Sequence, residues 1–191
     1  MSAPAASHSA VPAVSGVVPA VSNPTRLRLP DLLHATDRAA ADYLDGVYDH
    51  LLPPGGVPVD DRWYTRLHGD DDLDVWLISW APGHPTELHD HAGSLGALTV
   101  LSGALNEFRW DGEELRRRRL DAGDQAAFPL GWVHDVVWAP TAVSVSSPRQ
   151  STLSVHAYSP PLTAMSYYEV TDRGRLKRVR TELTDKPEGD S

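Results

Sequence analysis

Three histidines in this chain have the residue type and spacing to hold a metal ion: His89 and His91, which lie two residues apart, and His134. Side chains alternate along an extended strand, so two residues at i and i+2 point to the same face. The His89-Asp90-His91 segment therefore predicts half of a metal site on a β-sheet, and His134 from a separate strand would complete it. Imidazole suits zinc, copper, iron and nickel alike, so the histidines alone do not choose the metal.

The histidines lie in two glycine-framed segments. Glycine permits the tight turns that bring the ends of two strands to one ion. Together the segments resemble the two cupin motifs, as Gly83-x5-His89-x-His91 with Gly103, then Gly123-x5-Pro129-x-Gly131-x2-His134. The first segment departs from the cupin pattern, because Leu95 and Gly96 stand where most cupins carry a glutamate. The alternative is that the three histidines are polar surface residues of a β-sandwich.

Short runs rich in Trp, Val, Leu, Ile and Thr, separated by turn residues, predict strands. They are Trp63–His68, Asp74–Trp80, Glu87–His91, Gly96–Ser102, Ala104–Trp110, Glu114–Leu120, Asp124–Phe128, His134–Trp138, Thr152–Tyr158 and Ser166–Val170, with a further strand in Leu176–Leu183. Asp111-Gly112 is a type I′ hairpin signal. We expect an all-β-dominated fold, a cupin double-stranded β-helix or jelly-roll barrel with a small N-terminal helical cap.

The expected domain organisation is simple. Residues 1–23 are read as a disordered leader, residues 24–183 as a single cupin domain, and residues 184–191 as a flexible tail. Within the domain, a helical cap occupies about 30–52, because apolar residues recur at spacings of three and four until Pro53-Pro54-Gly55-Gly56. The barrel occupies about 60–183.

Composition excludes several classes of protein. The net charge of −9 argues against nucleic-acid binding, and we read the basic run from Arg116 to Arg119 as a solvated hairpin of mixed charge. No apolar stretch approaches about 18 residues, so no membrane span is expected. The chain has no cysteine, which fits a reducing compartment, and we expect a cytoplasmic protein.

Other segments carry a more specific resemblance. Ser154-Val155-His156-Ala157-Tyr158-Ser159-Pro160-Pro161 resembles the Ser-x-His-x-Tyr-Ser-Pro-Pro segment of the cysteine dioxygenase family, and Tyr64-Thr65-Arg66 resembles its Tyr-Thr-Arg segment. Trp80-Ala81-Pro82-Gly83-His84, followed by His89-Asp90-His91, is similar to its Trp-x-x-Gly-His…His-Asp-His stretch. The resemblance runs from about Tyr64 to Pro161, in the family's order and with similar spacings.

This resemblance implies a mononuclear Fe(II) enzyme that adds both atoms of O2 to the sulfur of L-cysteine and forms cysteine sulfinate. His89, His91 and His134 would hold the iron, and cysteine would chelate it through thiolate and amine. The Arg66 guanidinium is a planar fork suited to the substrate carboxylate, and Tyr64 on the same face would assist. Members of the family are commonly monomeric, so we expect a monomer.

Ser154, His156 and Tyr158 alternate along one predicted strand and therefore share a face. Ser154 would orient His156, and His156 would hold the Tyr158 hydroxyl near the metal. Animal members of the family carry a cysteine five residues after the second iron ligand, cross-linked to this tyrosine. Gly96 stands there in this chain, so the Tyr158 phenol is expected to be free.

Other functions remain open from the sequence. One is a dioxygenase of another small thiol acid such as 3-mercaptopropionate, although relatives with that activity typically carry Gln at the carboxylate-binding position. A second is a metal cupin that acts as an isomerase or decarboxylase, which would work with Mn or Zn and without O2. A third is a cupin that binds a small ligand and has no turnover.

Overall fold

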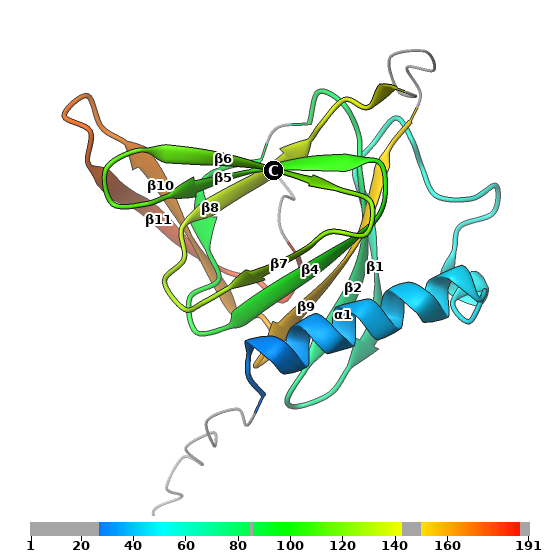
Figure 1. Cartoon of the computed structure of the whole chain (residues 1–191). Coiled ribbons are helices and arrows are strands. Elements are labelled where there is room, and N and C mark those ends of the chain that lie inside the picture. Colours follow the sequence, from blue (N-terminus) through cyan, green and yellow to red (C-terminus); the bar gives the residue numbers. More distant parts are fainter. Residues whose placement is uncertain (1–26, 85, 143–149, 188–191) are drawn as a thin grey trace, which may run out of the picture.

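Eleven strands form two facing antiparallel sheets in the computed structural model, which describes residues 27–84, 86–142 and 150–187 (Figure 1). The five-stranded sheet has the order β1-β2-β9-β4-β7, and the six-stranded sheet has the order β11-β10-β3-β8-β5-β6. The strands are β1 (Trp63–Gly69), β2 (Asp74–Trp80), β3 (His89–Asp90), β4 (Leu95–Ser102), β5 (Ala104–Trp110), β6 (Leu115–Asp121), β7 (Gln125–Phe128), β8 (His134–Trp138), β9 (Thr152–Ser159), β10 (Ala164–Val170) and β11 (Leu176–Leu183). This is a cupin double-stranded β-helix with one α-helix on its N-terminal side, which confirms the predicted fold class.

Each predicted strand is present, and its ends lie within two residues of the predicted ends. The hairpin between β5 and β6 differs in its turn. The loop spans four residues, 111–114, and is closed by Asp111, whose Oδ1 accepts hydrogen bonds from the backbone N–H groups of Glu113 and Glu114 at 3.0 and 2.9 Å. The predicted hairpin is confirmed, but a type I′ turn centred on Asp111 and Gly112 is wrong, because only Gly112 of these two residues has a positive φ.

Strands β2 and β9 lie inside the five-stranded sheet and are buried on both faces. Along β2, Val75 and Leu77 pack beneath the helix, whereas Trp76 and Ile78 belong to the core between the sheets. This two-sided burial explains why every residue of β2 is buried and why its sequence is nearly continuously apolar. The inward face of β9 can then carry polar groups without exposing them to water.

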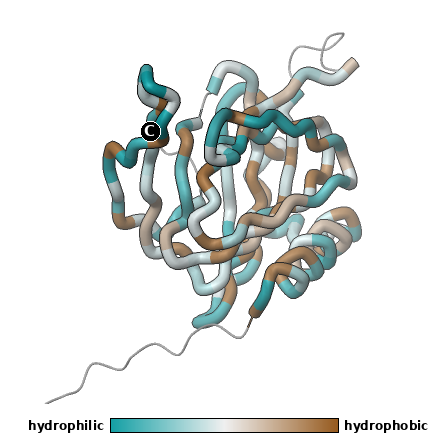
Figure 2. Tube along the Cα trace, turned by 60° about the vertical axis from the view of Figure 1, so that its left-hand side comes forward, coloured by the Kyte–Doolittle hydropathy of each residue, from teal (hydrophilic) through white to brown (hydrophobic). Residues whose placement is uncertain are grey.

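Helix α1 (Leu29–Leu44) lies across the outer face of the five-stranded sheet, against β4 and β9 (Figure 1). Hydrophobic residues recur along it between hydrophilic ones (Figure 2), and Leu32, Ala39 and Ala40 are its buried apolar residues. Pro30 stands in the first turn, where its missing N–H costs nothing.

The helical segment is shorter than predicted. Helix α1 ends at Leu44, and a separate 3₁₀ turn follows at Asp49–Leu51. Gly46 has φ of +78°, a left-handed conformation that glycine adopts without a steric penalty and that commonly ends helices. The prediction missed this helix end, because apolar residues continue to recur at helical spacing as far as Leu51.

The predicted leader, residues 1–23, lies outside the described residues, as do residues 188–191 of the predicted tail. The described part of the tail contacts the barrel, because the backbone N–H of Thr184 donates to the Thr163 carbonyl at 3.1 Å.

Gly103 joins β4 to β5 with φ of +77°. A Cβ there would overlap the Thr152 hydroxyl oxygen, which itself bonds both backbone groups of Ala104, and would lie 3.0 Å from Thr152 Cα. We predict that Gly103→Ala lowers the free energy of unfolding by about 3 kcal/mol, from backbone strain and steric overlap together. Urea denaturation measures this change.

Gly112→Ala is the matched control, since Gly112 has φ of +107° but nothing within 4 Å of its would-be Cβ. Gly112→Ala should therefore show the backbone strain alone. Equal losses in the two variants would show that the contact with Thr152 contributes nothing.

Candidate metal centre

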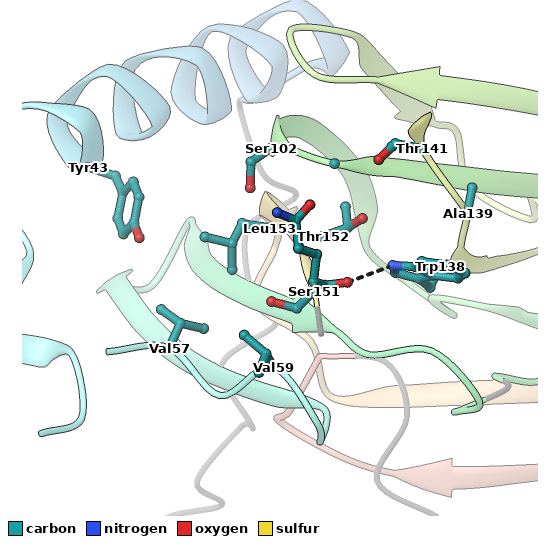
Figure 3. Close-up of a pocket in the computed structure, with 12 residues that line it drawn as sticks. Tyr43, Val57, Val59, Ser102, Trp138, Ala139, Thr141, Ser151, Thr152 and Leu153 are labelled. Atoms are coloured by element: carbon teal, nitrogen blue, oxygen red, sulfur yellow. Dashed lines mark hydrogen bonds between the residues drawn. The ribbon is translucent and has the colours of Figure 1, made fainter. Parts of the chain in front are cut away.

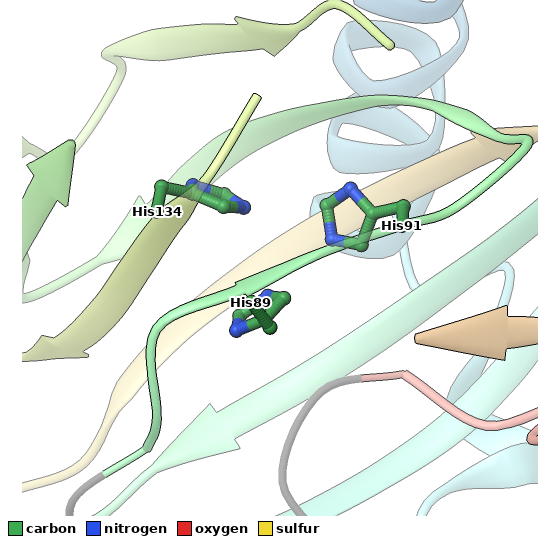
Figure 4. Close-up of side chains that lie close together, drawn as sticks. All are labelled: His89, His91 and His134. Atoms are coloured by element: carbon green, nitrogen blue, oxygen red, sulfur yellow. The ribbon is translucent and has the colours of Figure 1, made fainter. Parts of the chain in front are cut away.

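The three predicted histidines meet at one point inside the barrel (Figure 4). His89 lies in β3, His91 follows it directly, and His134 begins β8. Strand β3 pairs antiparallel with β8, with His89 opposite His134. One ligand atom from each ring lies within 4.8 Å of those from the other two, and all three side chains are buried. Pairing between β3 and β8, rather than sequence proximity, brings the third histidine to the other two.

Asp90 lies between two of these histidines but faces the other way, as strand alternation requires. Its Oδ2 accepts a hydrogen bond from the Tyr168 hydroxyl at 2.7 Å, and its Oδ1 accepts one from the Ala92 backbone at 2.9 Å. Ala92 has φ of +49°, which turns the chain out of the strand. This turn is one reason why β3 is shorter than the predicted strand Glu87–His91.

Hydrogen-bond partners orient two of the rings. His89 Nδ1 lies 2.6 Å from the Glu87 carbonyl oxygen, and because a carbonyl only accepts, Nδ1 carries the proton. His134 Nδ1 lies 3.4 Å from a carboxylate oxygen of Glu107, which favours the same tautomer. In both rings Nε2 then keeps its lone pair for a metal. Three such imidazoles in a buried cluster fit a divalent transition-metal ion.

Glu107 on β5 is the charged residue beneath this cluster, and sequence reasoning missed it. Its side chain is 2% exposed, and it accepts hydrogen bonds from Arg118 at 2.5 and 2.9 Å and from Trp132 Nε1 at 3.3 Å. Burial raises the pKa of the Glu107 carboxyl, but contacts with His134 and Arg118 outweigh burial and hold that pKa below its usual value. The sequence contained one indication of this role. Glu107 lies two residues after Leu105 in a predicted strand, so its carboxylate shares the inward face with that apolar side chain.

The face formed by Ser154, His156 and Tyr158 is on β9, and all three side chains are fully buried. His156 Nε2 lies 3.0 Å from the Ser154 hydroxyl, and His156 Nδ1 lies 3.2 Å from the Tyr158 hydroxyl. The Tyr158 ring packs edge-on against His91, with ring centroids 4.9 Å apart. The chain of hydrogen bonds therefore ends beside a predicted metal ligand.

Gly96 lies opposite Tyr158 in the pairing of β4 with β9. A Cβ at Gly96 would lie 3.0 Å from a ring carbon of Phe128 and 3.2 Å from His91 Nδ1. The absence of a side chain thus lets the His91 ring lie directly against the β4 backbone.

Arg66 and Tyr64 lie on the inward face of β1, opposite Trp76 and Ile78 of β2. The Arg66 guanidinium lies 4.6 Å over the Trp76 ring, and its side chain is 42% exposed. Its Nε lies 3.5 Å from the Asp74 carboxylate, and its Nη2 donates to the Asp185 carbonyl at 3.3 Å. Sequence reasoning did not identify Asp74, because that contact joins two strands.

Two more residues next to the Ser154 face were not given a role from sequence. Trp80 was read only as packing, yet its Nε1 donates to the Ser154 hydroxyl at 2.8 Å. The Arg62 guanidinium lies 4.0 Å over the Trp80 ring. Arg62 precedes Tyr64 by two residues, and this spacing was the available signal that it shares the inward face.

A separate cavity of about 360 Å³ shares no lining residue with the predicted site (Figure 3). Tyr43, Val57, Trp138 and Thr152 are among its lining residues, and Trp138 Nε1 donates to the Gln150 carbonyl at 3.2 Å. We therefore build the site around the histidines and not around this cavity.

The sequence of this chain is similar to one family of known proteins. The family model described as cysteine dioxygenase type I matches residues 58–171. Cysteine dioxygenase type 1 of Danio rerio is 26% identical over 113 residues, 56% of each chain. The Homo sapiens protein of that name is 27% identical over 108 residues, 51% of this chain and 52% of its own. The matched region thus spans about half the length of these curated relatives.

Two solved structures are similar to part of this chain. A Klebsiella pneumoniae protein with a double-stranded β-helix domain aligns with a TM-score of 0.44 and 19% identity, over 72% of this chain and 94% of its own. A cupin-like protein of Thermotoga maritima aligns with a TM-score of 0.46 and 20% identity, over 60% of this chain and 82% of its own. In the described part of this chain, no helix has the length and apolar character needed to cross a membrane.

Glu107→Gln is predicted to weaken metal binding by about 10- to 100-fold, because the neutral amide orients the His134 ring less strongly than the carboxylate does. A Co(II) titration against a competing chelator measures the affinity without turnover. Glu113→Gln, at an exposed position in the β5–β6 loop, is the control and should bind like the wild type. If Glu107→Gln bound Co(II) as tightly as the wild type, Glu107 would have no role in supporting the metal site.

Asp74→Asn is predicted to stabilise the protein at neutral pH. Burial raises the pKa of the Asp74 carboxyl, and the nearby Arg66 only partly offsets it. A raised folded-state pKa means that stability is lost as the pH rises through that pKa. The gain in melting temperature from Asp74→Asn should therefore grow from about pH 4, the ordinary range of aspartate, to pH 7.

Asp70→Asn should show the opposite slope. Hydrogen bonds from the backbone of Asp72 and from His68 lower the pKa of the Asp70 carboxyl. That carboxylate stabilises the fold above its unfolded pKa, so its removal costs more as the pH rises. If the change in melting temperature had the same pH dependence in both variants, the raised pKa of the Asp74 carboxyl would be contradicted.

Proposed function

This chain belongs to the cysteine dioxygenase type I family, and we propose that it is a thiol dioxygenase that uses Fe(II) and O2 to convert L-cysteine to cysteine sulfinate. The observation that carries the proposal is the buried group of three histidines with the Tyr158 ring 4.9 Å from His91. The site residues are His89, His91 and His134 as metal ligands, Arg66 and Tyr64 as substrate-binding residues, and Ser154, His156 and Tyr158 as the catalytic face.

Neutral imidazoles leave the charge of a divalent ion uncompensated. Three histidines without a carboxylate therefore favour an anionic ligand from the substrate, and a thiolate is such a ligand. Bound Fe(II) would supply the positions at which the thiolate and O2 meet. Phe128 packs against His91 and His134, with ring centroids 6.0 and 4.2 Å apart, and such an apolar neighbour would keep water away from a reactive sulfur.

The electron balance needs no further reductant. Both atoms of O2 end on the sulfur, which supplies the four electrons that reduce O2, and the thiol proton is released. The residues of the chain therefore have to position the substrate and to place hydrogen-bond donors near it. Tyr158 suits the second task, because its ring lies against His91 and its hydroxyl is held by His156.

Arg66 suits the recognition of a carboxylate. Its guanidinium is held over the Trp76 ring, which orients the planar fork of donors at the inward face of β1. Asp74 lies 3.5 Å from Arg66 Nε, so the substrate carboxylate competes with this neighbour for the positive charge. A reducing cytoplasm suits both Fe(II) and a free thiol substrate, and we propose that the protein acts there as a monomer.

Oxygen consumption tests the function directly. The Fe(II)-loaded protein should consume O2 with L-cysteine, with a larger kcat/KM than with 3-mercaptopropionate. Arg66→Gln should lower kcat/KM for L-cysteine by about 10- to 100-fold, the effect of losing one hydrogen bond between charged groups. An oxygen electrode and steady-state kinetics with both thiols measure these values.

Arg175→Gln is the matched control, because Arg175 is exposed in the loop between β10 and β11 and should leave the kinetics unchanged. No O2 consumption with any small thiol would refute the dioxygenase. A tenfold preference for 3-mercaptopropionate in the wild type would refute L-cysteine as the substrate. Turnover of a sugar or oxo-acid with Mn(II) or Zn(II) in the absence of O2 would favour a non-oxygenase cupin.

A further inference from the structure

Two polar atoms of β2 are buried without a hydrogen-bond partner among the described residues. One is an acceptor, Asp74 Oδ2, and the other is a donor, Trp76 Nε1. Asp74 is 2% exposed and Trp76 is 6% exposed, so solvent water has little access to either side chain. A buried polar atom without a partner loses the hydrogen bonds that it made to water in the unfolded chain. Native proteins keep few such atoms, so two of them on one strand call for an explanation.

Both side chains face the predicted site. Residues two apart on a strand share a face, and Trp76 belongs to the core between the sheets. In the pairing of β2 with β9, Asp74 lies opposite Tyr158 and Trp76 lies opposite His156. In the pairing of β2 with β1, Trp76 lies opposite Arg66. The two atoms without partners therefore belong to neighbours of three predicted site residues.

Arg66 is close to both residues but does not supply the missing bonds. Its Nε lies 3.5 Å from Asp74 Oδ1, which leaves Oδ2 without a partner. Its guanidinium lies 4.6 Å over the face of the Trp76 ring, whereas the indole N–H points out from the edge of that ring. The three side chains thus combine a cation, an anion, one unused donor and one unused acceptor.

This combination is complementary to an amino acid. The carboxylate of an amino acid accepts hydrogen bonds, and Arg66 and Trp76 Nε1 are donors. The amino nitrogen keeps at least one N–H whether it is protonated or bound to a metal, and Asp74 Oδ2 is an acceptor. Arg66 and Asp74 carry opposite charges, as do the carboxylate and ammonium groups of an amino acid.

The effect of Asp74 on stability supports a role in binding. Burial raises the pKa of the Asp74 carboxyl, and the nearby Arg66 only partly offsets it. The ionised carboxylate is therefore unfavourable in the free protein. Side chains that lower stability are typical of functional sites, where they are retained for binding or catalysis. A ligand with an N–H group would supply the partner that Oδ2 lacks.

We propose that Asp74 and Trp76 complete the substrate site and select a thiol that carries both a carboxylate and an amino group. Trp76 Nε1 donates to the carboxylate beside Arg66, and Asp74 Oδ2 accepts from the amino nitrogen. A thiol acid without an amino group leaves Asp74 unpaired, and a site built for a donor rejects a ligand that lacks one. This inference rests on the proposed function, and it explains why L-cysteine should be preferred over 3-mercaptopropionate.

Binding without turnover tests the role of Asp74. Anaerobic calorimetry measures the affinity of the Fe(II)-loaded protein for L-cysteine and for 3-mercaptopropionate. Asp74→Leu keeps the shape of the side chain and removes both oxygens. The preference for L-cysteine should fall by about 10- to 100-fold, the effect of one hydrogen bond to a charged group. Asp74→Asn, which is expected to stabilise the protein, keeps one acceptor oxygen and should retain part of the preference.

Trp76→Phe tests the second residue. Phenylalanine keeps a ring beneath Arg66 but removes the indole N–H. Because both thiols carry a carboxylate, both affinities should fall by about tenfold and the preference should stay unchanged. Unaltered affinities for both thiols would overturn the role of Trp76.

Asp72→Leu is the matched control for Asp74→Leu, because Asp72 is exposed in the loop before β2, and it should leave both affinities unchanged. Each preference compares two thiols in one preparation, so a misfolded fraction of a variant does not alter it. A wild-type preference in both Asp74→Leu and Asp74→Asn would overturn the role of Asp74.

Oxygen consumption separates this inference from the proposed function. If L-cysteine binds with the expected dependence on Asp74 but no thiol is oxidised, the function is refuted and the binding assignment stands. If the wild type oxidises L-cysteine but Asp74→Leu lowers kcat/KM equally for both thiols, the function stands and Asp74 does not determine specificity.

Discussion

The burial of polar side chains inside a β-barrel is the constraint on which the rest of this structure depends. Each buried imidazole, hydroxyl and carboxylate needs a partner, since an unpaired one costs about 1–3 kcal/mol. The barrel meets part of this demand with pairs that cross strands, such as Glu107 with His134 and Trp80 with Ser154, and part with the local contact between the His89 ring and the Glu87 carbonyl. The groups that are paired in this way are held in one geometry, whereas Asp74 Oδ2 and Trp76 Nε1 are buried without a hydrogen-bond partner among the described residues.

Burial of apolar side chains offsets the free-energy cost of the polar groups inside the barrel. The outward side chains of β2, β4 and β9 pack beneath helix α1 and form a second apolar cluster with Leu32, Ala39 and Ala40. Hydrophobic burial is thus divided between the two faces of the five-stranded sheet. Helix α1 carries no predicted site residue, yet it supports β9, the strand that carries Ser154, His156 and Tyr158.

Much of the architecture could be predicted because strand alternation is a local rule. It placed His89 and His91 on one face, and it placed Ser154, His156 and Tyr158 on another. The end of helix α1 at Leu44 was not predicted, because apolar residues keep their helical spacing past Gly46 although the backbone leaves the helical conformation there.

The contacts around the site residues could not be predicted by that rule. Glu107 beneath His134 and Asp74 beside Arg66 depend on which strands are neighbours, and that order does not follow from spacing within a strand. Arg62 over Trp80 depends in addition on side-chain direction. Spacing along the chain thus located the site residues but did not reveal the groups that orient them.

The close approach at Gly96 has a consequence for the evolutionary routes open to this chain. The family resemblance implies a cysteine at this position in animal members, linked to the tyrosine. In this barrel a side chain at Gly96 would press on His91 and Phe128 at once, at 3.2 and 3.0 Å from its first carbon. A glycine-to-cysteine exchange would therefore disturb a histidine of the cluster before any link to Tyr158 formed. An exchange at this position would therefore require the Phe128 and His91 rings to shift, so packing favours glycine here.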